Sequence, residues 1–122
     1  MKLLHTILFM VAALSINGDS ITGDFCGSDS PFVNKLEMYF CDESHFNASA
    51  SIFGKKNECD NQVYIYNSTD ENIDISSNEN TCLEKLFNKY NIQLSDIKCT
   101  YDGTNIDFIV DGQTVKLTEA AC

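Results

Sequence analysis

Apolar and polar residues alternate most regularly in the last third of the chain. Residues 97–101, 105–110 and 114–117 each have apolar side chains at alternate positions, as in half-buried strands. Asp102-Gly103 and Asp111-Gly112 separate these runs. Asp-Gly between two alternating runs is typical of a tight hairpin turn, because both turn positions favour a positive φ. The pattern therefore predicts a three-stranded antiparallel meander.

The middle of the chain predicts two strands and a helix. Residues 62–66 are apolar on both faces, as in a central strand, and Ile73 and Ile75 predict an edge strand beside it. Residues 81–84, Thr-Cys-Leu-Glu, have the spacing of a capping box, which begins a helix. The expected buried stripe of this helix is Leu83, Leu86, Phe87 and Tyr90, with Asn91 as its left-handed end.

Residues 31–41 fit two descriptions. Ser30-Pro31 is a helix-start signal, whereas Leu36, Met38 and Phe40 alternate as in a strand. We favour the helix because of the start signal, and we expect only a short extended piece and a turn within 44–61. The resulting fold class is α+β, with two short helices packed on an antiparallel sheet that ends in the meander.

The N-terminus has the parts of a secretory signal peptide. Lys2 precedes the apolar run 3–14, and small and polar residues follow up to Gly18. We expect cleavage after Gly18, with Ser15 as the alternative, and a single cysteine-rich secreted α+β domain over residues 19–122. A buried N-terminal helix is the competing interpretation. The apolar run is shorter than the roughly 20 residues that span a membrane.

All six cysteines lie beyond the signal peptide. An even number of cysteines in an exported chain predicts disulfides, here three, with the pairing left open. The residues are Cys26, Cys41, Cys59, Cys82, Cys99 and Cys122. A zinc site is the alternative, but no two cysteines have the C-x-x-C spacing that favours one. Asn47 and Asn67 each begin an N-x-[ST] sequon and are predicted to be glycosylated in the extracellular space.

The charge is strongly negative. There are 18 acidic residues against 8 basic ones, and removing Lys2 with the signal peptide changes the net charge from −10 to −11. Such a chain should be repelled by nucleic acid and by anionic membranes, and attracted to a basic protein surface. The alternative explanation is that the negative charge only keeps the protein soluble. We expect no nucleic-acid partner and no membrane span.

The residues give little support to catalysis. His45 is the one histidine beyond the signal peptide, it lies among acidic residues, and the chain has no arginine. Residues 70–81 resemble a calcium loop, but Ile75 and Thr81 stand where the loop needs glycine and glutamate. We therefore expect no enzyme, no cofactor and no metal site.

The leading hypothesis is an extracellular protein that binds another protein through its surface. Tyr64 and Tyr66 are its candidate interface residues, because we expect Val63 and Ile65 to take the inner face of their strand. An alternative is an inhibitor of an extracellular hydrolase, in which the loop 53–59 presents Lys55 and Lys56. A further alternative is a carrier of a small apolar ligand between the sheet and the helices.

Overall fold

Two antiparallel sheets make up most of the protein. The computed structural model describes residues 20–29 and 33–122. The first sheet has four strands in sequence order: β1 (Gly23–Asp29), β2 (Val33–Phe40), β3 (His45–Ile52) and β4 (Lys55–Val63). The second has five, also in sequence order: β5 (Ile65–Asn67), β6 (Asn72–Asp74), β7 (Ile97–Tyr101), β8 (Ile106–Val110) and β9 (Gln113–Leu117).

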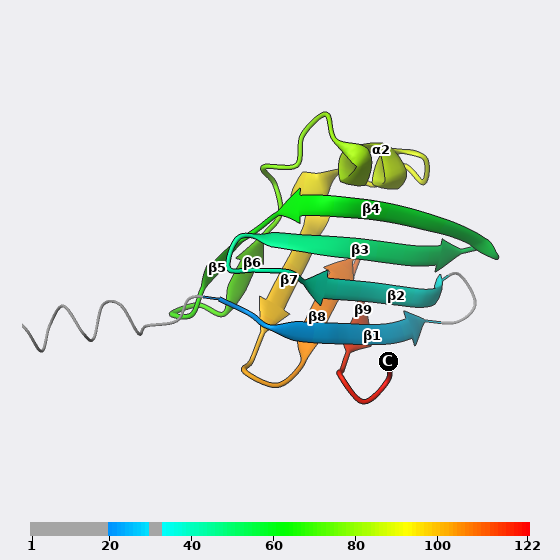
Figure 1. Ribbon diagram of the computed structural model, residues 1–122. Coiled ribbons are helices and arrows are strands. Elements are labelled where there is room, and N and C mark those ends of the chain that lie inside the picture. The colour runs from blue at the N-terminus through cyan, green and yellow to red at the C-terminus, as the bar shows by residue number, and fades with distance from the viewer. Residues whose placement is uncertain (1–19, 30–32) are drawn as a thin grey trace, which may run out of the picture.

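The two sheets face each other with their strands crossing steeply, and α2 (Cys82–Asn88) lies at one end beside β4 (Figure 1). A short 3-10 helix (Leu94–Asp96) follows α2. The expectation of two helices on a single sheet is wrong, because the described residues hold one α-helix and two packed sheets. The fold is mostly β, and the core lies between the two layers.

The segment 31–41 is the main correction. Residues 33–40 form β2, which pairs with β1 on one side and β3 on the other, so the helix predicted there is wrong. The alternation of Leu36, Met38 and Phe40 prevails, since all three face the core. The helix-start signal at Ser30-Pro31 lies outside the described residues. Neighbouring strands satisfy the backbone of β2 on both edges, which a local start signal cannot offset.

The chain passes from the first sheet to the second at Tyr64. The apolar run 62–66 is therefore divided between the end of β4 and the start of β5, which are both edge strands, so the expectation of a central strand there is wrong. The strand expected at an edge, β6, lies instead between β5 and β7. The Tyr64 amide donates to the Ser44 carbonyl, and its ring turns into the core, where it is 2% exposed. The sheets also meet at their other edge, where Cys26 and Thr118 exchange two backbone hydrogen bonds of 2.9 Å.

The C-terminal meander is confirmed. Strands β7, β8 and β9 pair in order, and Asp111 and Gly112 have the positive φ values that a two-residue hairpin turn needs, 51° and 76°. The two-residue turn predicted at Asp102-Gly103 is wrong, because Tyr101 pairs with Ile106 and four residues connect the strands, with a positive φ at Gly103 alone. The helix predicted after residue 81 is also present, and Asn91 has the expected left-handed conformation. Its cap differs from the expected box, because the Glu84 carboxylate accepts from the Asn80 amide and not from Thr81.

Candidate functional site

A cavity of about 440 Å³ lies between the two sheets, near α2 and the turn that joins β3 to β4. Its walls come from β2, β3, β8, β9 and the residues in and after α2. The side chains that line it are Val33, Leu36, Ala50, Ile52, Phe53, Phe87, Tyr90, Ile92, Phe108, Val110, Asp111, Gln113 and Val115. Nearly all of them are apolar, so the interior favours an apolar occupant.

Small residues on β3 explain why the space is left open. Every second side chain of β3 faces the core, and these positions hold Phe46, Ala48, Ala50 and Ile52. Ala50 faces the cavity and pairs with the larger Leu36 of β2, and Val115 of β9 lines the same space. Protein cores are normally packed without voids much larger than a water molecule. The space is partly open to solvent, so it is a pocket and not a sealed void, and the features to explain are its volume and its apolar lining.

The region of the core around Tyr64 is filled by aromatic rings. Phe40 contacts Phe25 at 5.8 Å, Phe46 at 5.8 Å and Tyr64 at 5.0 Å between ring centroids. The Tyr64 hydroxyl donates to the Asp42 carbonyl at 2.8 Å, and burial raises the pKa of this phenol. None of these four rings lines the cavity, so the packed cluster and the open space divide the core between them.

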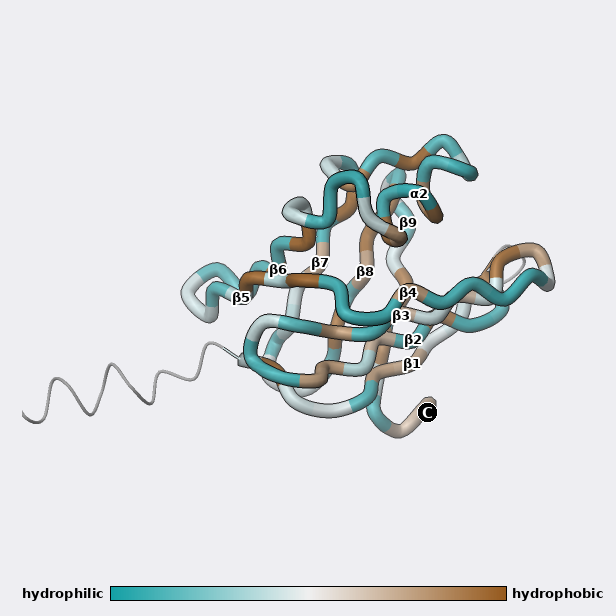
Figure 2. The backbone as a smooth tube through the Cα atoms, turned by 45° about the horizontal axis from the view of Figure 1, so that its top comes forward, coloured by the Kyte–Doolittle hydropathy of each residue, from teal (hydrophilic) through white to brown (hydrophobic). Residues whose placement is uncertain are grey.

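Aromatic and polar side chains form the rim of the cavity. The rings of Phe53 and Tyr90 lie 6.1 Å apart and join the β3–β4 turn to the residues after α2. Figure 2 shows this turn as a hydrophobic stretch that projects at the end of the first sheet. Phe53 is 65% exposed, and the amide of Gly54 is held by the Asn34 side chain at 3.0 Å. Asp111 and Gln113 add polar groups from the β8–β9 turn.

The residues expected to form a protein interface have different surroundings. Tyr64 is buried, and the half-buried Tyr66 packs on Tyr101 with ring centroids 5.7 Å apart, so the expectation that both face outward is wrong. Lys55 and Lys56 are exposed at the start of β4. The expected inhibitory loop is largely strand, because Lys55 already pairs with Ile52 across a two-residue turn. Protein binding and hydrolase inhibition stay untested predictions.

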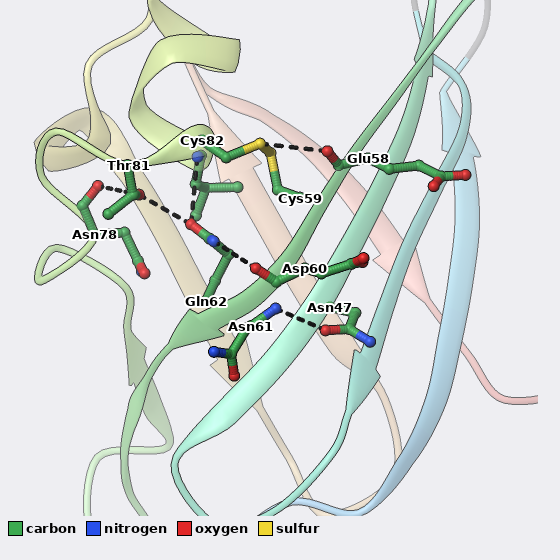
Figure 3. Close-up of a disulfide and its surroundings, with 10 residues drawn as sticks. Asn47, Glu58, Cys59, Asp60, Asn61, Gln62, Asn78, Thr81 and Cys82 are labelled. Atoms are coloured by element: carbon green, nitrogen blue, oxygen red, sulfur yellow. Dashed lines mark hydrogen bonds between the residues drawn. A yellow bond between two sulfur atoms is a disulfide. The ribbon is translucent and has the colours of Figure 1, made fainter.

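Two disulfides are present instead of the expected three. Cys26 pairs with Cys122, and Cys59 pairs with Cys82, with Cα–Cα distances of 5.0 and 5.5 Å. The second bridge fastens α2 to β4, next to the Gln62 side chain, which donates to the Asp60 carbonyl and accepts from the Leu83 amide (Figure 3). Cys41 is exposed after β2 and Cys99 is buried in β7, so these two thiols remain free. Burial raises the pKa of Cys99 to about 12.

One cluster has the composition of a metal site. Potential ligand atoms of Asp24, Cys26, Glu37 and Cys122 lie within 4.8 Å of one another. However, the two sulfur atoms are joined to each other, which leaves two carboxylates as donors. These carboxyl groups share a hydrogen bond, which together with burial raises the pKa of Glu37. The arrangement is that of a carboxyl pair beside a disulfide.

The remaining predicted residues lie at the surface. Asn47 is partly exposed on β3 and accepts from the Asn61 amide at 2.8 Å (Figure 3), and Asn67 is exposed at the end of β5. Glycosylation of both asparagines stays a prediction. His45 lies 3.1 Å from the Asp42 carboxylate, and hydrogen bonds from Ser44 and His45 lower the pKa of Asp42.

Sequence reasoning missed the residues that line the cavity. Ala50 and the exposed Phe53 carried no motif, and the available signal was the alternation of small residues over 46–52. Over residues 20–29 and 33–122, no helix is long and apolar enough to cross a membrane. No protein-family model matches the chain, and no curated protein or solved structure matches it either.

Proposed function

We propose that this protein is a secreted carrier of a small apolar molecule, which it holds between its two sheets. The observation that supports the proposal is the cavity of about 440 Å³, lined almost wholly by apolar side chains. Binding sites for small molecules usually measure about 300–1,000 Å³ and combine apolar walls with a few polar groups. The cavity fits this description in both volume and lining.

The construction of the cavity also supports reversible binding. Its walls come from paired strands whose backbone hydrogen bonds hold them in place. The exposed Phe53 ring lies on a two-residue turn at the rim, where a small movement can admit a ligand. Among the described residues that line the cavity, Asp111 and Tyr90 carry the only ionisable side chains, a set suited to recognition. The two disulfides and the expected signal peptide are compatible with an extracellular role.

A cavity-filling substitution tests the proposal. The wild-type protein should bind a neutral, apolar fluorescent naphthalene derivative, with enhanced fluorescence and saturation at one site. Ala50→Phe should abolish binding, because the new ring fills the space next to Leu36 and Val115. Ser51→Phe is the matched control, since the neighbouring side chain points to the outer face of β3 and the added ring should leave binding unchanged.

Circular dichroism in the aromatic region should show that both variants keep their tertiary packing. If Ala50→Phe does not fold, Ala50→Leu fills less of the cavity and should weaken binding of the probe without abolishing it. Saturable binding that is equal in the wild type and both folded variants would place the probe elsewhere and contradict the proposal. An absence of binding to the wild type would contradict it as well.

A further inference from the structure

We infer, on the basis of the proposed carrier function, that the preferred ligand is an apolar amine whose ammonium group lies at the rim beside Asp111. Asp111 is the one charged side chain that lines the cavity among the described residues. It is exposed, and its carboxylate makes no ion pair or hydrogen bond with the described residues. A ligand cation can therefore reach the carboxylate without displacing a partner.

The backbone holds this carboxylate at a defined place. Asp111 and Gly112 form the two-residue turn between β8 and β9, where Val110 pairs directly with Gln113. The side chains of Val110 and Gln113 line the same cavity, so the turn projects Asp111 at its edge. When the alkyl chain of an amine enters between the sheets, its ammonium group would stay at the edge of the cavity, beside this turn.

Aromatic rings at the same rim also favour a positive charge. Phe53 and Tyr90 line the cavity with their ring centroids 6.1 Å apart. The faces of aromatic rings attract ammonium groups, typically by about 0.5–1 kcal/mol at exposed sites. The net charge of −10 raises the local concentration of cations over that of fatty-acid anions.

Lys55 is the residue that would favour a negatively charged ligand instead. It is exposed, and it pairs with Ile52, so it shares the side of the sheet that faces the cavity. However, it does not line the cavity, whereas Asp111 does. A comparison of variants at these two positions therefore separates an amine ligand from a carboxylate ligand.

The experiment compares decylamine, decanol and decanoate as competitors of the neutral naphthalene probe, at pH 7, at low salt and below micelle-forming concentrations. The amine should bind about fivefold more tightly than the alcohol, since one exposed ion pair and one ring contact each contribute modestly. Decanoate should bind most weakly. Asp111→Asn should reduce this advantage to about twofold, the share left to the ring contact, and leave decanol binding unchanged, because asparagine also tolerates a positive φ.

Two controls keep the result specific. Asp60→Asn removes the same charge from an exposed position on β4 that does not line the cavity, and Lys55→Gln removes the competing cation; neither should reduce the advantage of the amine. An amine that binds no better than the alcohol, or an advantage that Asp111→Asn does not reduce, would overturn the inference. Decanoate binding most tightly would overturn it too, while decanol binding would still support a carrier. Failure of decanol itself to bind would instead count against the carrier function.

Discussion

The buried Asn78 side chain ties the connection between β6 and α2 to the end of β4. Its Oδ1 accepts from the Val63 amide at 2.8 Å, and its Nδ2 donates to the carbonyls of Val63 and Ile75 at 2.8 and 2.7 Å. The side chain is 1% exposed, so water cannot readily replace these bonds. Asn78 thereby positions α2, which contributes Phe87 to the wall of the cavity.

Asn78→Ala should lower the free energy of unfolding by about 3–5 kcal/mol. The substitution removes three hydrogen bonds at about 1 kcal/mol each and leaves the buried Val63 amide and carbonyl without this partner, while the Ile75 carbonyl still accepts from the backbone amide of residue 78. Asn78→Asp should cost a similar amount, because it keeps the acceptor for the Val63 amide but loses both donors. Asn88→Ala is the control, since Asn88 is exposed on α2, and its effect should stay within about 0.5 kcal/mol.

Urea unfolding of the oxidised protein, followed by tyrosine fluorescence and circular dichroism, measures these differences. The slopes of the unfolding curves should agree among the variants, so that the midpoints report stability. A loss below about 1 kcal/mol for Asn78→Ala would refute the reasoning, because the three bonds would then be replaced by solvent or by other groups.

Further predictions concern the cysteines and one carboxyl group. By the entropy of loop closure, replacing the Cys26–Cys122 bridge with alanines should cost about 4.7 kcal/mol and replacing the Cys59–Cys82 bridge about 3.4 kcal/mol, as measured by urea unfolding. A thiol reagent followed by mass spectrometry should modify Cys41 in the native protein and Cys99 only after unfolding. The pKa of Glu37 is raised in the folded protein, so its protonated carboxyl group contributes stability that is fully present below the unfolded pKa of about 4.3. This contribution is lost as the pH rises through the folded pKa. The stability of Glu37→Gln should therefore increase relative to that of the wild type between pH 4 and pH 7, as measured by urea unfolding.

The parts of the fold that the sequence predicts correctly are those set by local chemistry. Asp111 and Gly112 suit a turn with positive φ wherever it occurs, so the meander could be read directly. The four residues 81–84 likewise marked where α2 begins, although the Glu84 side chain caps a different amide. These features depend on a few neighbouring residues and little on the rest of the chain.

The first sheet depends on partners far along the chain. Residues 45–52 alternate between apolar and polar side chains, but two of the four apolar ones are alanines, so the hydrophobic signal is weak and becomes a strand through pairing with β2 and β4. The orientation of Tyr64 was misjudged because the chain changes sheets at that residue. The cavity could not be predicted, since it is a volume left between two sheets whose pairing the sequence alone did not reveal.

Binding of n-alkyl alcohols of increasing length tests the carrier function most directly. These ligands carry no charge, so the result depends on the cavity and not on Asp111. Each methylene group that enters the cavity should contribute about 0.8 kcal/mol, which is about a fourfold gain in affinity. We expect this gain per methylene in titration calorimetry, followed by a plateau once the chain fills the space of about 440 Å³, and an earlier plateau in Ala50→Leu. Affinity that does not change with chain length, or no binding at any length, would contradict the account.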